Sequence, residues 1–528
     1  MSLRSLAVVL LLTGVTATRS EAANAVSHQG ITWSFSSDRP TGTFANGEPW
    51  VVGPVTVTAI SPNPSSSVNG TMHGSMKNPV PAARQGFDSN VPTISTTTYS
   101  AALNVALSLP ANFNGGDVLV SSKTDYSYPN YFETICALTV LSSPPPAGSF
   151  RPGIYGTDRA VRWNKSQINW SVLKNLAPVA GIPSQAEIEA KLPPLPWFEW
   201  HSIYLAAHMM PWRNTAAGNG GDGKPSTYGR EIAKKWGEVG LWLNTSNTQA
   251  AKEKAMIQTI QCGIDIWSYV THGGGFYHDG GHKCGRKFPV FLAAVALNDS
   301  TLRSFVSNPR IFQEDTQTFY VQQSDVGRAV DSPNIGYSQS HVGMAEWGIR
   351  HAFEPNKDDS RWTGGTPYRH VVWPAMGGQV LAAELMGQKA AWGHPAIFDY
   401  NARYHSQGGI TGFVGNMWTA HKSGGVIVPP IVVPPPPPTE FAVGNRVSMI
   451  RNTNVRATGS LTGTLLGVQS TGALGTILSG PVSADGVTWW QVNFDNGADG
   501  WAGADNFALS NSTATAPSAP TGLKVIQN

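Results

Sequence analysis

The sequence predicts a multidomain fold: an N-terminal β-sandwich, a central all-α (α/α) toroid-like domain and a small C-terminal β-barrel. Three observations predict it. The 528 residues are more than one hydrophobic core organises. Apolar residues alternate with period two before residue 143 and recur with period 3.6 after it. A proline-rich segment then separates the helical pattern from a last series of short strands.

Residues 1–22 have the organisation of a secretory signal peptide. Arg4 precedes an apolar run over residues 6–12, and the small residues Ser20 and Ala22 flank the expected cleavage position. This run is too short for a permanent membrane anchor, and no other segment approaches the required length of about 18 apolar residues. We therefore expect a secreted protein, extracellular or periplasmic, without a membrane span.

Composition narrows the class of partner. The net charge is +3 without any block of like charge, which argues against a nucleic-acid-binding protein. The 18 Trp residues in a chain with only 13% charged residues favour carbohydrate, because indole faces stack on sugar rings. The cysteines Cys136, Cys262 and Cys284 are too few for a disulfide framework. Cys262 and Cys284 could pair, although buried free thiols are favoured.

Residues 23–143 read as the β-sandwich. Residues 31–35 alternate with period two, and residues 50–60 are rich in Val and Thr. The turn-rich segment 42–50 is most simply a hairpin loop, and the alternative is a loop that reaches a neighbouring cleft.

Residues 144–425 read as the toroid-like catalytic domain, which begins at a triple proline. Spacings of four, three and four place Ile232, Trp236, Val239 and Leu243 on one helical face. Long loops rich in Gly, Asn, Trp and His separate the helical patterns, as is typical of an incomplete α/α toroid. The other expected helices span residues 196–210, 248–270, 288–307, 341–352, 375–388 and 408–420.

The C-terminal part begins with a Pro-rich linker, residues 426–440, which is a semi-rigid spacer. The motif residues of the next segment, 441–508, are Asn454, Val455, Arg456, Gly467, Gly475, Gly480, Pro481, Gly486, Trp489, Trp490, Gly500 and Trp501. In these residues the segment resembles a bacterial SH3-like domain, which implies binding to a cell-wall or matrix polymer. Residues 509–528 form a linker and then resemble the truncated start of a fibronectin type III domain, so the chain reads as a fragment of a longer modular protein.

The overall plan, with its signal peptide, β domain, helical toroid and wall-type module, resembles secreted bacterial polysaccharide lyases. The resemblance is architectural, and it implies cleavage of an acidic, uronate-containing glycan by β-elimination. Such a reaction requires a group that neutralises the uronate carboxylate, a base for the adjacent proton and an acid for the leaving oxygen. Candidate residues for these roles follow from their chemistry alone.

The first candidate cluster is residues 277–287, which follow a run of three glycines. Tyr277 or His278 is a candidate base, assisted by His282, and Arg286 or Lys287 could hold the carboxylate. The alternative is a histidine-rich loop that caps the following helix. A zinc pair formed by His278 and His282 would need a helix, which the intervening glycines disfavour, so no metal ligand is assigned. A divalent cation, Ca or Zn, could still neutralise the uronate.

The second cluster comprises Trp212, Arg213, Asn214, Tyr228 and Arg230 on a glycine-rich loop. Tyr228 lies where a helix begins, and free N–H groups at a helix start favour anions. We expect Arg213, Asn214 and Arg230 to clamp a carboxylate and Tyr228 to share the proton transfer. The alternative is a loop arginine paired with Asp222 or Glu231.

The third cluster is His341 with Trp347. His341 could be a base that complements a tyrosine from elsewhere, and Trp347 could stack on a sugar ring.

Two other functions stay open. One is a glycoside hydrolase on the same scaffold, which would use two carboxylates. The other is a non-enzymatic protein that binds wall or matrix polysaccharide. The candidate carboxylates are Asp222, Glu231, Asp279 and Glu346.

Overall fold

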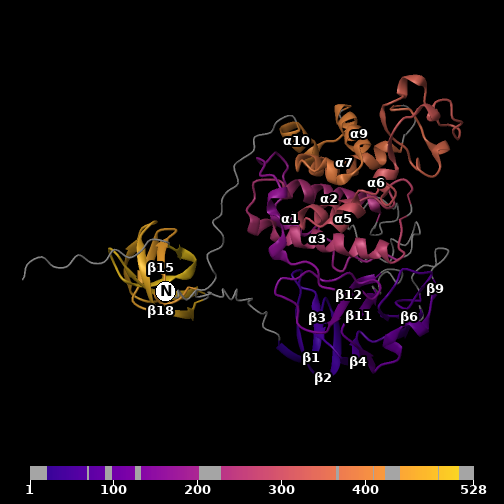
Figure 1. Ribbon diagram of the computed structural model, residues 1–528. Coiled ribbons are helices and arrows are strands. Elements are labelled where there is room, and N and C mark those ends of the chain that lie inside the picture. Colours follow the sequence, from indigo (N-terminus) through magenta and orange to yellow (C-terminus); the bar gives the residue numbers. More distant parts are fainter. Residues whose placement is uncertain are drawn as a thin grey trace, which may run out of the picture. The chain divides into compact units, whose positions relative to one another are not determined.

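The computed structural model resolves the chain into two compact units, Met1–Ile431 and Val432–Asn528 (Figure 1). Each unit has its own hydrophobic core. The described residues are 21–67, 70–89, 98–124, 132–200, 228–276, 278–363, 368–407, 409–422, 441–485 and 487–510. The predicted signal peptide lies outside them except for Glu21 and Ala22, with which the first strand begins.

The N-terminal part is one curled, mixed sheet of eight strands, which replaces the predicted β-sandwich. The strand order is β10-β4-β2-β3-β12-β11-β7 with β1 paired to β2, and β3 and β12 are the parallel pair. The strands are β1 (Glu21–His28), β2 (Ile31–Thr43), β3 (Pro49–Val52), β4 (Val55–Ser61), β7 (Ser75–Lys77), β10 (Ala111–Phe113), β11 (Val118–Thr124) and β12 (Phe132–Leu141). Two small two-stranded sheets accompany it: β5 (Ser65–Ser67) with β6 (Gly70–Met72), and β8 (Arg84–Gln85) with β9 (Thr98–Tyr99).

The helices, rather than a second sheet, cover the other face of β11 and β12. Leu119 and Leu138 point into the sheet's own core, which also contains Trp33. Their neighbours Val120 and Ala137 point the opposite way, into the core shared with the helices. A strand buried on both faces does not need a second sheet, and this is why the sandwich prediction was wrong.

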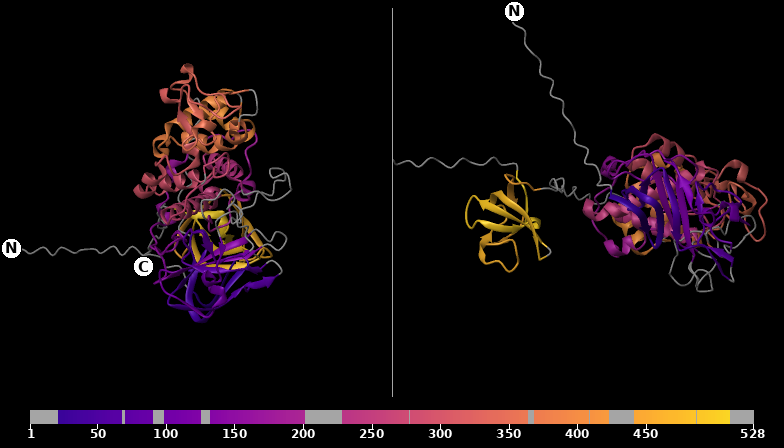
Figure 2. Two further views of the ribbon diagram at one scale, coloured as in Figure 1. Left: turned by 90° about the vertical axis from the view of Figure 1, so that its right-hand side faces the viewer. Right: turned by 90° about the horizontal axis from the view of Figure 1, so that it is seen from below.

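The helical part contains, among its described residues, ten α-helices and a two-stranded sheet. The helices are α1 (Gln185–Glu189), α2 (Gly229–Leu243), α3 (Gln249–Thr271), α4 (Lys287–Ala296), α5 (Ser300–Val306), α6 (Gln313–Thr316), α7 (Arg369–Leu385), α8 (Lys389–Trp392), α9 (Pro395–Ser406) and α10 (Gly412–His421). The strands β13 (Thr318–Tyr320) and β14 (Ala345–Trp347) pair antiparallel. Figures 1 and 2 show α2 to α5 between the sheet and the group α7, α9 and α10.

No central all-α toroid is evident in this arrangement, so that prediction was also wrong. The helices stack in layers on the sheet, with α2 packed mainly on α7 and α3 on α4. The predicted helix 341–352 contains β14 instead. Glu346 of this strand is fully buried between Arg369 and Arg403. These ion pairs and the pairing with β13 override the local helical pattern.

A buried ion triad joins the sheet to the helices. Arg151 lies 2.7 Å from a carboxylate oxygen of Glu48, which precedes β3, and 2.6 Å from one of Asp265 in α3. All three side chains are almost completely shielded from solvent. The loop 42–50 therefore does reach its neighbour, through Glu48, and the contact is structural.

The second unit is a seven-stranded antiparallel sheet with the order β17-β16-β20-β19-β18-β15-β21, in place of the predicted small barrel. Val447, Val455, Ile477 and Val492 form its core with Trp490. The strands are β15 (Arg446–Met449), β16 (Thr453–Arg456), β17 (Leu465–Gln469), β18 (Leu474–Ala484), β19 (Val487–Phe494), β20 (Gly500–Gly503) and β21 (Phe507–Leu509).

Two further expectations concern cysteines and membranes. Cys136, Cys262 and Cys284 are buried free thiols, as favoured from the sequence.

Within the described ranges, no helix combines the length and the apolar character that crossing a bilayer requires.

Candidate functional site

Two tyrosines from distant parts of the chain meet at the centre of the candidate site. Tyr228 precedes α2 and Tyr368 precedes α7, and their hydroxyl oxygens lie 2.5 Å apart. The backbone N–H of Gly281 donates to the Tyr228 hydroxyl at 3.1 Å. Burial, together with the hydrogen bond to Tyr368, raises the pKa of Tyr228 far above its usual value. Tyr228 therefore keeps its proton at neutral pH.

The glycine pair of the 278–282 loop makes room for both rings. A Cβ on Gly280, whose φ is +52°, would lie 2.8 Å from the Tyr368 ring. A Cβ on Gly281 would lie 3.0 Å from the ring and hydroxyl of Tyr228. The close approach of the two phenols therefore depends on residues without side chains.

His282 supplies an imidazole beside the phenol pair. Its ring centroid lies 5.1 Å from that of Tyr228 in an edge-on arrangement. Its Nδ1 lies 2.8 Å from the carbonyl oxygen of Asp279. A carbonyl only accepts, so Nδ1 carries the proton and Nε2 is the basic nitrogen. Burial lowers the pKa of His282, which keeps the ring neutral at pH 7.

His278 lies at the start of the same loop and is held by α6. Its Nδ1 lies 2.7 Å from the hydroxyl of Thr316, which itself donates to the carbonyl of Gln313 at 3.2 Å. The Thr316 oxygen therefore accepts a proton from Nδ1 of His278. Burial lowers the pKa of His278 to about 4, so this imidazole is neutral at neutral pH. Its ring centroid lies 5.2 Å from that of Phe353.

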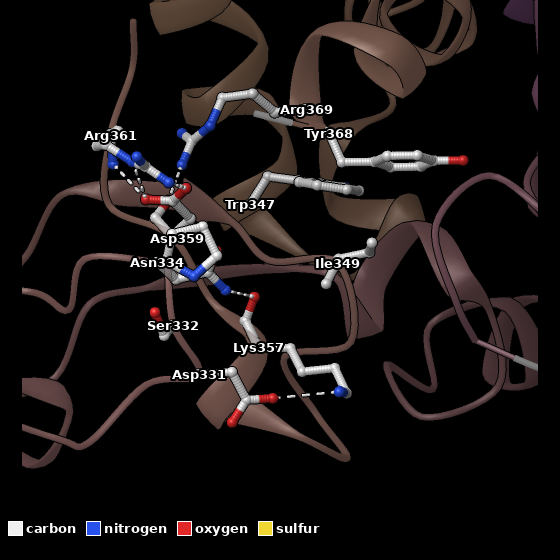
Figure 3. Close-up of a pocket in the computed structure, with 11 residues that line it drawn as sticks. Asp331, Ser332, Asn334, Trp347, Ile349, Lys357, Asp359, Arg361, Tyr368 and Arg369 are labelled. Atoms are coloured by element: carbon white, nitrogen blue, oxygen red, sulfur yellow. Dashed lines mark hydrogen bonds and ion pairs between the residues drawn. The ribbon is translucent and has the colours of Figure 1, made fainter. Parts of the chain in front are cut away.

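A pocket of about 590 Å³ adjoins the phenol pair (Figure 3). Tyr368 belongs to both, because its ring lines the pocket while its hydroxyl meets Tyr228. Trp347 lies parallel to Tyr368 with ring centroids 6.5 Å apart and planes 16° apart, and the two rings form an aromatic wall. The lining residues are Asp331, Ser332, Pro333, Asn334, Trp347, Ile349, Lys357, Asp359, Arg361, Tyr368 and Arg369.

The pocket carries three cations and two carboxylates, each cation paired. Lys357 lies 3.2 Å from Asp331, and Arg361 lies 2.6 Å from Asp359. Hydrogen bonds from Asn356 and Lys357 lower the pKa of Asp331. Burial acts to raise the pKa of Asp359, but hydrogen bonds from Arg361 outweigh it and the net shift is downward. Both carboxylates are therefore ionised at neutral pH, and Lys357 is the most exposed of the paired cations.

Arg286 and Lys287, predicted to hold substrate, are buried instead. Arg286 pairs with Glu199 at 2.6 Å. Lys287 pairs with Asp315 and donates to the carbonyl of Trp392 at 2.7 Å. Both side chains are fully shielded, so they do not meet a polymer and act as scaffold below the loop. Both residues were predicted to bind substrate because this segment is rich in charged residues, and the sequence does not show which of its cations are buried.

The other predicted residues are only partly brought together. Arg230 pairs with Glu231 and donates to the carbonyl of Val371, which fits the paired-arginine alternative. His341 lies in a short turn, 2.9 Å from the Ser338 hydroxyl, and does not line the pocket. The predicted site residues Trp212, Arg213, Asn214 and Tyr277 lie outside the described residues.

Sequence reasoning missed Tyr368, the residue that links the pocket to Tyr228. Tyr368 and Arg369 stand at the beginning of a helix, as Tyr228 and Arg230 do. The spacing of tyrosine and arginine differs between the two segments, so the sequence carried no signal that pairs them. Lys357 and Arg361 lie in irregular segments whose patterns predict no common site.

No protein-family model matches the chain, and neither a curated protein nor a solved structure does. In the part of the chain that the structure describes, no group of three or more His, Cys, Asp or Glu side chains is arranged to hold a metal ion. The site is therefore interpreted from its own geometry.

Proposed function

We propose that this protein is a secreted polysaccharide lyase that cleaves an acidic, uronate-containing glycan by β-elimination. The observation that carries the proposal is the Tyr228–Tyr368 pair, with a neutral His282 beside it and a cation-bearing pocket next to it. These groups correspond to the acid, the base and the carboxylate-neutralising charge that the reaction needs.

In the proposed reaction, a uronate residue stacks on Tyr368, whose ring is backed by the buried Trp347, and Lys357 holds its carboxylate. Nε2 of His282 takes the proton from the carbon beside the carboxylate. The electron pair of that C–H bond forms the C=C bond, and the C–O bond to the leaving sugar breaks. Tyr368 gives its proton to the leaving oxygen and recovers one from Tyr228. Solvent then returns the proton from His282 to the phenol pair.

One observation favours a glycoside hydrolase as the second candidate: Asp331 and Asp359 line the same pocket. A hydrolase needs one carboxyl group that stays protonated at working pH. The pKa values of Asp331 and Asp359 are both lowered, so neither fits that role. Of the other carboxylates considered, Glu231 and Glu346 are paired with arginines. The lyase therefore remains the first candidate.

We also propose that the second unit binds a cell-wall or matrix polymer and keeps the enzyme near its substrate. The proposal rests on the motif residues of the 441–508 segment. The full chain without this unit should cleave soluble polymer normally but lose retention on insoluble wall material.

The test uses the full chain with alginate, glucuronan, ulvan and glycosaminoglycans. A lyase produces an unsaturated uronate that absorbs in the ultraviolet, together with new reducing ends. Reducing ends without that absorbance would indicate the hydrolase. Retention of a polymer without any product would indicate a binding protein. The Tyr228→Phe variant shows whether the described site carries the activity.

A further inference from the structure

The exposed large apolar residues of the helical part lie between positions 335 and 371, the part of the chain that also supplies most of the pocket lining. Among the described residues from 132 to 422, the exposed large hydrophobic residues are Ile335, Val342, Phe353 and Val371. Ile335 follows the lining residue Asn334.

Phe353 is the aromatic member of this group, and the residue is 58% exposed. It lies four residues from both Ile349 and Lys357, which line the pocket on either side of it in the chain. Hydrogen bonds from the N–H groups of Phe353 and Glu354 to the carbonyl of Arg350 fold the intervening turn tightly. The turn therefore carries Phe353 between two lining residues of the chain, although Phe353 itself is not a lining residue.

The His278 ring contacts the Phe353 ring, and His278 belongs to the loop of the candidate site. The ring centroids are 5.2 Å apart. Two residues beyond His278, the N–H of Gly280 donates to the carbonyl of Ile349. The same loop thus contacts the base of Phe353, the pocket wall and the phenol pair. The planes of the two rings are tilted by 53°, and Phe353 remains 58% exposed, so much of its apolar surface is accessible to a ligand.

We propose that Phe353 is a stacking platform for a sugar residue next to the one that is cleaved. This rests on the proposed function and extends it: the site binds several consecutive residues of an acidic polymer. The apolar C–H face of a pyranose ring covers the exposed ring face, while its charged and hydroxyl groups remain in water. Substrate therefore continues beyond the 590 Å³ pocket, as cleavage within a chain requires.

The test measures binding separately from turnover. The full chain carrying Tyr228→Phe is run in native gels that contain alginate, glucuronan or chondroitin sulfate, with dextran as the neutral control polymer. We expect at least one acidic polymer to retard it. Adding Phe353→Ala should weaken this retention about tenfold, and Phe353→Trp should preserve it. The matched control is Leu107→Ala, which truncates a 51% exposed apolar side chain in the sheet half.

Two results would overturn the platform. One is the absence of any effect of Phe353→Ala in the acidic gels, whether both proteins are retained equally or neither is retained. The other is a dimer in light scattering that Phe353→Ala converts to a monomer with unchanged retention, which would identify the patch as a contact between copies. Failure of the lyase proposal would give a different result. Phe353→Ala would still weaken retention in the gel, but the protein without substitutions would form no unsaturated product.

Discussion

The hydroxyl oxygens of Tyr228 and Tyr368 lie 2.5 Å apart, although the residues are 140 positions apart in the chain. One of the two phenols must donate to the other, and the Gly281 N–H donates to Tyr228 as well. The Tyr228 oxygen is thus an acceptor for the backbone, and either phenol can donate to the other. Tyr368 is the one of the two phenols that lines the pocket, so in the proposed reaction it delivers the proton.

Replacing either phenol should remove most of the proposed activity. Tyr368→Phe removes the proton donor, and Tyr228→Phe removes the group that resupplies it. Loss of a general acid typically costs about 10²- to 10⁴-fold in rate. We expect kcat for formation of the unsaturated product to fall within that range for Tyr368→Phe, with KM little changed. The measurement is the initial rate of ultraviolet absorbance increase.

The matched control is Tyr320→Phe. It removes a phenol that donates to Asp399 at 2.5 Å and that does not line the pocket. Its kcat should equal that of the parent. Equal losses in all three variants would mean that the phenols act only through stability.

A methyl group at Gly280 should separate the two tyrosines. In Gly280→Ala the new Cβ meets the Tyr368 ring at 2.8 Å. Gly343 offers the control, because its φ is +83° and a Cβ added there would meet nothing within 4 Å. Both substitutions should cost about 1 kcal/mol in unfolding free energy from the backbone alone. Only Gly280→Ala should also lose activity, and a similar rate in both variants would contradict this role.

The exposed pair of Lys357 and Asp331 should affect binding in opposite directions. Lys357→Gln removes a cation for the uronate and should raise KM about fivefold. Asp331→Asn removes the nearer of two carboxylates that pair with Lys357, since Glu354 remains at 3.6 Å, and should lower KM. Lys165→Gln is the control, because Lys165 forms an ion pair of similar exposure with Glu253. Steady-state kinetics on a soluble acidic polymer would measure this, and a fall in KM for Lys357→Gln would exclude the assignment.

Stability should decrease in acid because of His278. The pKa of this group is about 4 in the folded protein and 6.5 when exposed. Its contribution is therefore complete above pH 6.5 and is lost as the pH falls towards 4, because the unfolded chain takes up the proton first. The loss amounts to about 3 kcal/mol.

His278→Gln can keep a hydrogen bond to Thr316 but cannot ionise. Urea unfolding at about pH 7.5 and about pH 4.5 should therefore show a smaller pH effect in this variant. The same pH effect in both proteins would show that His278 is not the responsible group.

Local patterns in the sequence were sufficient for single helices. Ile232, Trp236, Val239 and Leu243 are all buried on α2, as their spacing predicted. The same kind of pattern failed over 341–352, because the buried Glu346 binds arginines from α7 and α9. Such partners lie far away in the chain, and periodicity does not contain them.

The candidate site was predictable as a location but not as a set of contacts. The glycine pair in the 278–282 loop correctly indicated a bend, and His282 meets Tyr228 as a result. Burial of Arg286 depends on Glu199, which is 87 positions away in the chain, and the meeting of Tyr228 with Tyr368 depends on how α7 packs beside this loop. The packing around this loop is determined by the whole hydrophobic core rather than by residues that are neighbours in the sequence.

The guanidinium of Arg151 has implications for dividing this protein into pieces. If the chain were cut after the sheet, Glu48 would leave with one fragment while Arg151 and Asp265 stayed on the other. Each fragment would also present a bare apolar surface where β11 and β12 now meet the helices. Neither half is then expected to be soluble alone, so gene dissection and domain transplantation should treat sheet and helices as one inseparable block.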